Sequence, residues 1–243
     1  MSALGSMVAG VAHELNTPIG NSLTVASALQ DQAQEFNNTL AQGLTRKQLE
    51  YFVHRVQEGT NILMNALSQA ADLVASFKQV AVDQTSVNRR PFDLRTTVDT
   101  ILLTLSADIR KTGHTVECQI PENISMNSFP GPLGQVLTNL INNALLHAFD
   151  NQVNGHVLIT AVLTSTDQVR ITVQDDGCGI TPAHLNRVFD PFFTTKLGQG
   201  GSGLGLHIVY NLVQELLGGR IQVDNTPGSG ACFTLLLPLE APS

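Results

Sequence analysis

Apolar residues recur every three or four positions along the first part of the chain. Between residues 3 and 35 they are Leu4, Val8, Val11, Leu15, Ile19, Leu23, Ala26, Leu29 and Ala33. This spacing places them on one face of a long helix. A polar segment follows, with Asn37, Asn38, Gln42 and Gly43. The pattern therefore predicts one long amphipathic helix that is interrupted there.

A second amphipathic helix is predicted after this polar segment. Thr45 is a suitable N-cap residue. The apolar stripe that follows comprises Leu49, Phe52, Val56, Leu63, Leu67, Ala70, Val74 and Phe77. Two such helices joined by a short loop form a hairpin with one apolar seam. Because a lone pair cannot bury this much apolar surface, we expect two copies to form a dimeric four-helix bundle. The alternative is an intramolecular pair packed on the rest of the chain.

The remainder of the chain has a mixed pattern. A polar segment at 83–91 ends in proline, so we expect two domains, residues 1–86 and 87–243. Within the second, the pattern predicts helices at 93–112, 131–149 and 203–218, strands near 114–120, 155–163 and 168–175, and a hairpin at 220–237 that turns at 226–230. Strands and helices mixed with antiparallel hairpins indicate an α+β domain, a two-layer sandwich.

Composition excludes several classes of protein. The 243 residues carry 20 acidic and 13 basic side chains, a net charge of −7, which argues against a nucleic-acid surface. Cys118, Cys178 and Cys232 lack the spacing of a disulfide framework or zinc site and are expected to be small buried side chains. No apolar run approaches membrane-spanning length. We expect a soluble, cytoplasmic segment without membrane contact, either complete or the cytoplasmic part of a longer, membrane-anchored sensor.

A candidate nucleophile lies in the first helix, in the sequence HELNTP at 13–18. His13 is two residues from Val11 and from Leu15, and each such step turns the helix by about 200°, so His13 is predicted to point away from the apolar stripe. Glu14 follows it, and Thr17 lies one turn further on the same face. A neutral imidazole is a competent nucleophile near pH 7, and a neighbouring carboxylate can accept its proton. For a histidine alone, a solvated side chain without a role is the alternative.

Four further motifs in the second half suit a nucleotide: NLINNA at 139–144, DDGCGI at 175–180, FDPFFTTK at 189–196 and GGSGLGL at 200–206. Asn139 and Asn143 share a helix face, and an amide oxygen is a suitable ligand for Mg²⁺, which binds mainly through phosphates. A pair of exposed amides is the alternative. Asp175 ends a strand and can accept a hydrogen bond from an exocyclic amine, while the two glycines after it let the backbone approach a flat ring. A tight turn would leave the same pattern.

The glycine-rich run precedes an apolar helix, and backbone N–H groups at a helix start can hold phosphates. The segment from Thr194 to Ser202 is expected to serve as a lid. Lys196 within it either contacts a phosphate or is solvated.

In this order, the motifs resemble the catalytic core of a sensor histidine kinase, with a dimerisation and histidine-phosphotransfer bundle followed by an ATP-binding domain of the GHKL superfamily. The resemblance covers nearly the whole chain. It implies a Bergerat-type α/β sandwich, with ATP and Mg²⁺ as cofactors. It also implies a homodimer that transfers phosphate from His13 to an aspartate in the receiver domain of a response regulator.

By this resemblance, His13 is phosphorylated, Glu14 is its acid–base partner, and Thr17 supports phosphatase activity. Asn143 would hold Mg²⁺, Asn139 would lie near the phosphates, and Asp175 would bind the adenine amine. Phe192 and Phe193 would anchor the lid. The nucleotide-contacting set implied comprises Asn139, Asn143, His147, Asp175, Gly177, Gly179, Phe193, Lys196, Gly201, Ser202, Gly203, Leu204 and Gly205.

Three positions depart from related patterns. Superfamily ATPases such as gyrase, MutL and heat-shock chaperones carry a glutamate four residues before the metal-binding asparagine, where this chain has Asn139. Without that carboxylate, water is poorly activated, which favours transfer over hydrolysis. Leu146 stands where kinases often have a basic residue, a charge that His147 or Lys196 could supply. Asp176 replaces a frequent asparagine. An ATPase driving conformational change and a non-catalytic dimeric scaffold that senses nucleotide are the rival functions.

Overall fold

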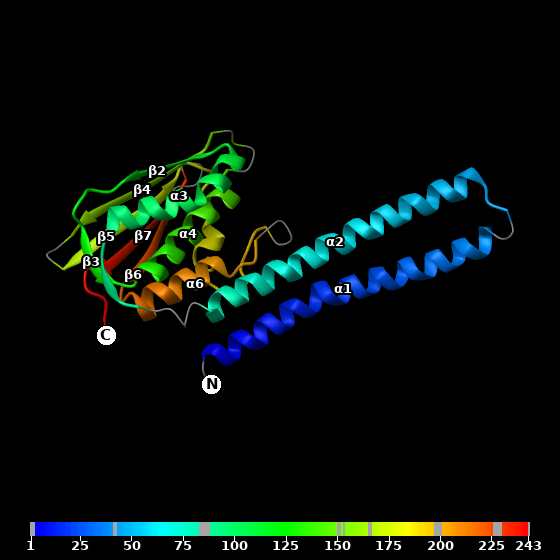
Figure 1. The fold of residues 1–243 in the computed structure, drawn as a ribbon, viewed down its shortest axis with the longest axis horizontal. Helices are drawn as coiled ribbons and strands as arrows, with labels where there is room; N and C mark the ends of the chain where they lie inside the picture. The colour runs from blue at the N-terminus through cyan, green and yellow to red at the C-terminus, as the bar shows by residue number, and fades with distance from the viewer. Residues whose placement is uncertain are drawn as a thin grey trace. The chain divides into compact units, whose positions relative to one another are not determined.

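The computed structural model describes residues 3–40, 43–82, 88–149, 152, 154–164, 167–196, 201–225 and 230–242, and gives the backbone alone for 3–14, 72, 73, 75–82 and 225. The chain divides into two compact units between Gln79 and Val80. The expected domain boundary after residue 86 lies outside the described residues and stays a prediction. The first unit is helical and the second combines helices with a sheet (Figure 1).

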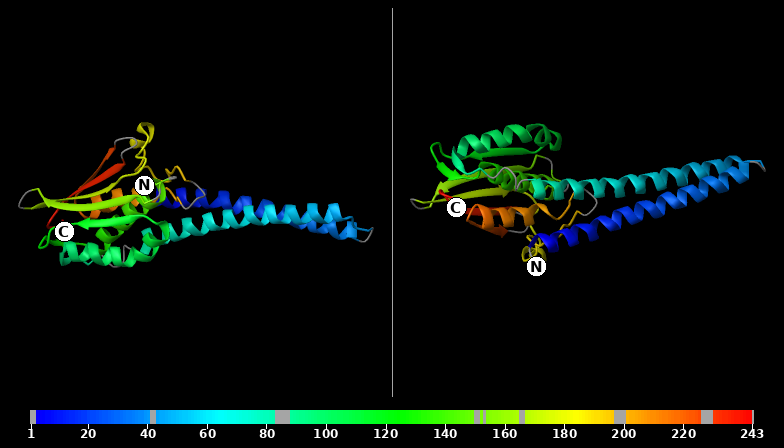
Figure 2. Two further views of the ribbon diagram at one scale, coloured as in Figure 1. Left: turned by 90° about the horizontal axis from the view of Figure 1, so that it is seen from above. Right: turned by 60° about the horizontal axis from the view of Figure 1, so that its bottom comes forward.

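The helical unit is a hairpin of α1 (Ala3–Leu40) and α2 (Arg46–Val82), which run side by side in all the views of Figures 1 and 2. The predicted N-cap of the second helix is confirmed. The Thr45 N–H donates to Gln48 Oε1 (2.9 Å) while the Gln48 N–H donates to Thr45 Oγ1 (3.3 Å), a reciprocal capping box. Near the closed end, the rings of Phe36 and Phe52 stack with centroids 4.0 Å apart.

A single hairpin covers only part of the predicted apolar stripe of α1. The residues of α1 that are buried or half-buried within the hairpin are Leu15, Pro18, Ser22, Val25, Leu29, Gln32, Phe36 and Thr39. The predicted stripe residues Ile19, Leu23, Ala26 and Ala33 are exposed instead, and Leu23 is 74% exposed. On α2 the predicted residues Leu49, Leu67 and Val74 are also exposed, at 44%, 47% and 51%. The hairpin therefore covers one edge of each predicted apolar face and leaves the other edge exposed.

The second unit has a five-stranded sheet in the order β2-β4-β5-β7-β6. Its strands are β2 (Thr115–Gln119), β4 (His156–Leu163), β5 (Gln168–Asp175), β6 (Arg220–Asn225) and β7 (Ala231–Pro238). In this sheet β2 and β4 pair in parallel, and the other neighbours are antiparallel. Alternate residues of β4, β5 and β7 are buried, so one face of the sheet lines the core.

Helices α3 (Leu94–Thr112), α4 (Pro130–His147) and α6 (Gly205–Asn211) cover that face (Figure 1). The last continues as a π-helical turn, η2 (Leu212–Leu216), within the predicted helix 203–218. The apolar core joins residues such as Val98, Leu140 and Val213 to Ile159 and Leu235 of the sheet, and its described members include no residue of the hairpin. The predicted two-layer α/β domain is confirmed.

The pattern did not predict three short elements: the strands β1 (Arg90–Asp93) and β3 (Ser125–Ser128), which pair antiparallel, and the helix α5 (Pro182–Leu185). Of the predicted turn at 226–230, only Gly230 is among the described residues.

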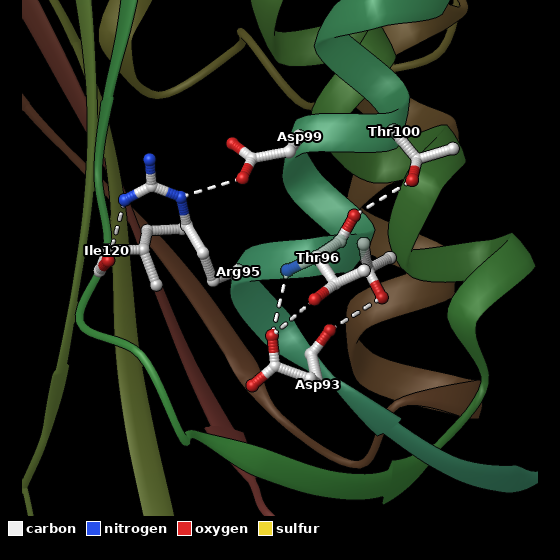
Figure 3. Close-up of polar contacts among 7 residues, drawn as sticks. Asp93, Arg95, Thr96, Asp99, Thr100 and Ile120 are labelled. Atoms are coloured by element: carbon white, nitrogen blue, oxygen red, sulfur yellow. Dashed lines mark hydrogen bonds and ion pairs between the residues drawn. The ribbon is translucent and has the colours of Figure 1, made fainter.

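Local capping fixes the start of α3 (Figure 3). Asp93 Oδ1 accepts hydrogen bonds from the Thr96 N–H (2.8 Å) and the Thr96 hydroxyl (2.9 Å), which lower the pKa of Asp93. Arg95 bonds to Asp99 and donates to the Ile120 carbonyl (3.0 Å), which connects the first turn to the segment after β2.

The beginning and the end of this unit are fastened together. Arg89 Nη2 lies 2.7 Å from Glu240 Oε1, and Asn127 forms backbone hydrogen bonds with Leu239 and Ala241. The residues that lead into β1 therefore contact the residues that follow β7.

No helix in the described part of the chain combines the length and apolar character needed to cross a membrane.

Candidate functional site

Asp175, the last residue of β5, is a buried carboxylate that is 6% exposed. Its Oδ1 accepts hydrogen bonds from two backbone N–H groups, of Gly177 (3.1 Å) and Ala231 (3.2 Å). Among the described residues no hydrogen bond reaches Oδ2. One oxygen thus anchors the side chain and the other is available to accept from a ligand donor such as an exocyclic amine.

Burial raises the pKa of Asp175, since the ionised form loses hydration, and the nearby Asp176 adds to the rise. Hydrogen bonds from the backbone of Ala231, Gly177 and Asp175 itself lower the pKa but do not cancel the effect of burial. A buried carboxylate that its surroundings stabilise poorly is typical of a binding site rather than of a structural contact.

The glycines after Asp175 bring its loop onto the end of α4. A Cβ atom on Gly177 would overlap the Ala148 carbonyl group, 2.6 Å from its carbon, and the Cys178 N–H donates to the Ala148 oxygen (2.8 Å). Gly179 has a φ of 70°, which favours glycine. In this structure Gly177 is therefore required for the approach to α4. The expectation that all cysteines are buried is wrong, because Cys178 in this loop is exposed and Cys118 and Cys232 are half-buried.

The asparagines of α4 lie next to the start of α6. Asn139 and Asn143 are both partly buried, and the Asn139 Nδ2 atom is buried without a partner in the described part of the chain. Its Oδ1 lies 3.9 Å from the position of a Cβ on Gly205, the first residue of α6. Leu204, the N-cap residue, provides no side-chain cap, so the first N–H groups of α6 have no side-chain acceptor there. Unpaired donors from two elements suit an anion such as a polyphosphate.

No group of three or more His, Cys, Asp or Glu side chains that could hold a metal occurs among the described residues. Asn143 by itself is a weak ligand. This donor set fits Mg²⁺ only as an ion that also binds phosphate oxygens and keeps waters.

The FDPFFTTK and GGSGLGL motifs contact each other closely in their described parts. Phe192 and Gly203 both have positive φ, 65° and 68°, and a Cβ on Gly203 would overlap Phe192, 2.7 Å from its Cα. The Gly201 N–H donates to the Lys196 carbonyl (3.2 Å). Residues 197–200, the middle of the expected lid, lie outside the described residues.

Phe193 is held by neighbours that the sequence did not indicate. The Arg187 guanidinium lies 4.8 Å from the centroid of its ring, and the His184 ring meets it edge-on at 5.3 Å. Both partners belong to α5 or follow it directly. These contacts hold the Phe193 ring, and the role of Phe192 and Phe193 as anchors of the lid stays a prediction.

His147 is the last residue of α4, and the Lys196 side chain reaches this end of the helix. Lys196 Nζ donates to the Leu146 carbonyl (2.6 Å), and the Thr195 hydroxyl lies 3.2 Å from His147 Nδ1. The lysine thus places a positive charge beside residue 146, as suggested for that position. Neither sequence alternative foresaw a backbone partner, and a phosphate contact by Lys196 stays a prediction.

The candidate nucleophile belongs to the other unit. His13, Glu14 and Thr17 all lie in α1. The side chains of His13 and Glu14 are outside the described part, so the predicted outward direction of His13 is untested. Thr17 is exposed.

Comparison with known proteins agrees with this division. Residues 130–241 match the family described as histidine kinase-, DNA gyrase B-, and HSP90-like ATPase. The sensor histidine kinase ZraS of Salmonella typhi is 32% identical over 246 residues, which cover 98% of this chain and 46% of that protein. The chain thus spans less than half of this relative.

Solved structures include the catalytic domain of histidine kinase ThkA, which is 28% identical with a TM-score of 0.56 and covers 63% of this chain and 97% of its own. A structure of ThkA in complex with the response regulator TrrA has a TM-score of 0.65 at 24% identity, covering 97% of this chain and 61% of that one. The second match extends the shared fold over both units.

Proposed function

We infer that this chain, which is a sensor histidine kinase catalytic core with a GHKL-type ATP-binding domain, phosphorylates its own His13 from ATP and passes the phosphoryl group to a response regulator. The proposal depends on one observation: Asp175 and Asn139, with the start of α6 beside it, belong to the same unit. The first offers a buried acceptor and the second offers buried donors, as an adenine and a polyphosphate require.

Each residue has a distinct role in the proposed binding step. Asp175 Oδ2 accepts from the adenine amine, and Asn139 with the N–H groups at the start of α6 binds phosphate oxygens. Asn143 is the protein ligand of Mg²⁺, which supplies charge neutralisation for the transfer when it is bound. The segment from Phe192 to Lys196 excludes water, since it contacts both Gly203 and the end of α4.

In the transfer step, an imidazole nitrogen of His13 attacks the γ-phosphorus and the bond to the ADP oxygen breaks. Glu14 accepts the proton that the imidazole loses. Because Asn139 stands where hydrolases of the superfamily carry a glutamate, no carboxylate at that position activates water, and the histidine is the better nucleophile. A receiver-domain aspartate then accepts the phosphoryl group. Thr17 orients a water that hydrolyses the aspartyl phosphate of the response regulator and releases inorganic phosphate, a phosphatase reaction distinct from the transfer.

We also propose that the chain acts as a homodimer through the helical unit. Five exposed apolar residues of α1 lie on average about 85° around the helix from its seam, and four of α2 about 65° from theirs, in the same sense. Tyr51 and Ile62 of α2 are also exposed but lie on the opposite flank. Since the helices are antiparallel, both stripes fall on the same flank of the hairpin. These stripes comprise Ile19, Leu23, Ala26, Ala33 and Leu40 on α1, and Leu49, Val53, Leu67 and Val74 on α2. A second hairpin would cover this flank.

The kinase proposal is tested with γ-labelled ATP. The unmodified chain should acquire a label that acid removes and alkali leaves, as a phosphoramidate does. His13→Gln should abolish labelling while the affinity for ATP stays within about twofold, because the nucleotide site belongs to the other unit. His54→Gln, in an exposed position of α2, is the matched control and should label normally. Rapid release of phosphate without any labelled protein would support an ATPase instead, and ATP binding without turnover would support a scaffold.

A further inference from the structure

The first residues of β7 contact Asp175 from a strand that is far away in sequence. Gly230 has a φ of 90°, and a Cβ on it would overlap the Asp175 carbonyl oxygen and lie 2.7 Å from the carbonyl carbon and 3.1 Å from Oδ1. The next residue, Ala231, donates its N–H to Oδ1. Gly230 and Ala231 therefore contact both the backbone and the side chain of Asp175.

The two donors to Oδ1 differ in what they can fix. Gly177 is two residues from Asp175 in the same loop, which packs against the end of α4, so its N–H fixes the carboxylate relative to that loop. Ala231 belongs to β7, which pairs with β5 up to Gln174 and Cys232, one step before Asp175. Its donor is therefore fixed relative to the sheet. This second bond ties the carboxylate directly to the sheet, which the bond from Gly177 does not do.

We propose that Gly230 and Ala231 are positioning residues for nucleobase recognition, which hold Asp175 so that Oδ2 faces the exocyclic amine of a purine. This inference rests on the proposed ATP-binding function and extends it to two residues outside the glycine-rich motifs already assigned. Gly230 permits the close approach of the strand, and the Ala231 N–H fixes the side chain.

The test compares two nucleotides in each variant of the full chain. ATP carries the 6-amino group, and purine riboside triphosphate lacks it while keeping the ring, the sugar and the phosphates. In the unmodified chain, ATP should bind more tightly than this analogue. In Gly230→Ala, the added methyl group displaces the start of β7, so ATP should bind about tenfold more weakly, as expected for losing one hydrogen bond to a charged group. The affinity for the analogue should hardly change, so the preference for ATP over the analogue should fall.

A second variant isolates the donor. Ala231→Pro removes the N–H at the first residue of a strand, where proline is tolerated. Ala231→Pro should reduce the preference for ATP over the analogue in the same way. If Gly230→Ala does not fold, Ala231→Pro alone tests the proposal. The matched control is Gly218→Ala. Gly218 also has a positive φ, 67°, and a Cβ on it would contact the Pro242 ring, with Cγ at 2.7 Å, but it lies beside the opposite end of β6 and β7. It should lower stability and leave the preference unchanged.

Two results would overturn the proposal. Equal losses for ATP and for the analogue in Gly230→Ala and Ala231→Pro would show a purely structural role. An unchanged preference in both, with Asp175→Asn still abolishing the preference for ATP, would show that Asp175 recognises the amine without help from β7, and would leave the proposed function intact. If the unmodified chain bound both nucleotides equally, the role of Asp175 in the proposed function would fail first, and this inference with it.

Discussion

The buried carboxylate of Asp175 suits the binding of a ligand donor, but its ionised form lowers the stability of the folded chain. Burial raises its pKa above the ordinary value of 3.8, so the ionised carboxylate is less stable in the folded chain than in the unfolded one. Relative to the unfolded chain, this group is most favourable below its ordinary pKa of 3.8 and becomes unfavourable as the pH rises through the raised pKa. Above the raised pKa the fold therefore carries the penalty of an ionised acceptor at this position.

Replacing Asp175 with asparagine should separate the two effects. The amide oxygen can still accept from Gly177 and Ala231, but the amide nitrogen would point a donor at the donor of the nucleobase. We expect ATP affinity to fall at least about tenfold by calorimetry, while the free energy of unfolding at pH 7 is unchanged or higher. This gain should shrink as the pH is lowered towards about 4. A clear loss of stability at pH 7 would contradict this account.

Single residues also mark the limit of sequence reasoning. Asp175 is recognisable because a strand-like run ends in an acidic residue followed by glycines. Its contact with Ala231 is not recognisable, because it depends on the register between β5 and β7, which begin 63 positions apart, at Gln168 and Ala231. Arg187 gave no signal either, since only the fold places its guanidinium against the ring of Phe193.

At the scale of elements, α3 shows how much a local signal can decide. An Asp followed three residues later by a Thr N–H donor fixes the helix start, and the pattern placed this helix within one residue of its observed bounds. The strands β1 and β3 were missed because each has only four residues, too few to establish an alternating pattern.

Removing the N-cap should weaken this element. Asp93→Ala deletes the acceptor of the Thr96 N–H and should lower the free energy of unfolding by about 1 kcal/mol in denaturant titrations. Because hydrogen bonding lowers the pKa of Asp93, its contribution is present above its ordinary pKa of 3.8 and is lost as the pH falls through the lowered value. Asp99→Ala removes an exposed ion pair from the same helix and should cost less than about 0.5 kcal/mol. Equal effects of the two substitutions would rule out a special role for the cap.

The proposed dimer interface, the exposed apolar flank of the hairpin, can be tested by substitution. Leu23 is 74% exposed within the hairpin, so Leu23→Glu should leave a single hairpin nearly undisturbed but place two charges in the proposed dimer interface. Light scattering should then show a shift from dimer to monomer at micromolar concentration. Asn38→Glu adds the same charge in an exposed position on another face of α1 and should keep the dimer. A monomeric parent chain, or a dimer that tolerates the Leu23→Glu substitution, would argue for the intramolecular alternative.

Across the whole molecule, the core of the second unit is self-sufficient. Every described residue of its apolar cluster lies between Phe92 and Ala241, so none comes from the hairpin. The sequence pattern indicated two domains, and motif order indicated which one binds nucleotide. Neither could indicate how the hairpin divides its apolar surface, because a helical stripe read from sequence does not say which partner covers it.

A fragment of residues 88–243 should therefore fold cooperatively and bind ATP with an affinity within about twofold of the full chain. It should incorporate no label from γ-labelled ATP, because it lacks His13. Circular dichroism and calorimetry would check the first expectation and autoradiography the second. An unfolded fragment would contradict the independence of the second unit. A fragment that labels itself would contradict His13 as the phosphorylated residue.

The ion pair between Arg89 and Glu240 has a consequence for how this unit combines with others. The residues just before β1 and just after β7 therefore lie next to each other. A module joined after residue 242 would begin close to Arg89, the residue before β1. The same proximity makes the unit suitable for circular permutation, with the old ends joined by a few residues.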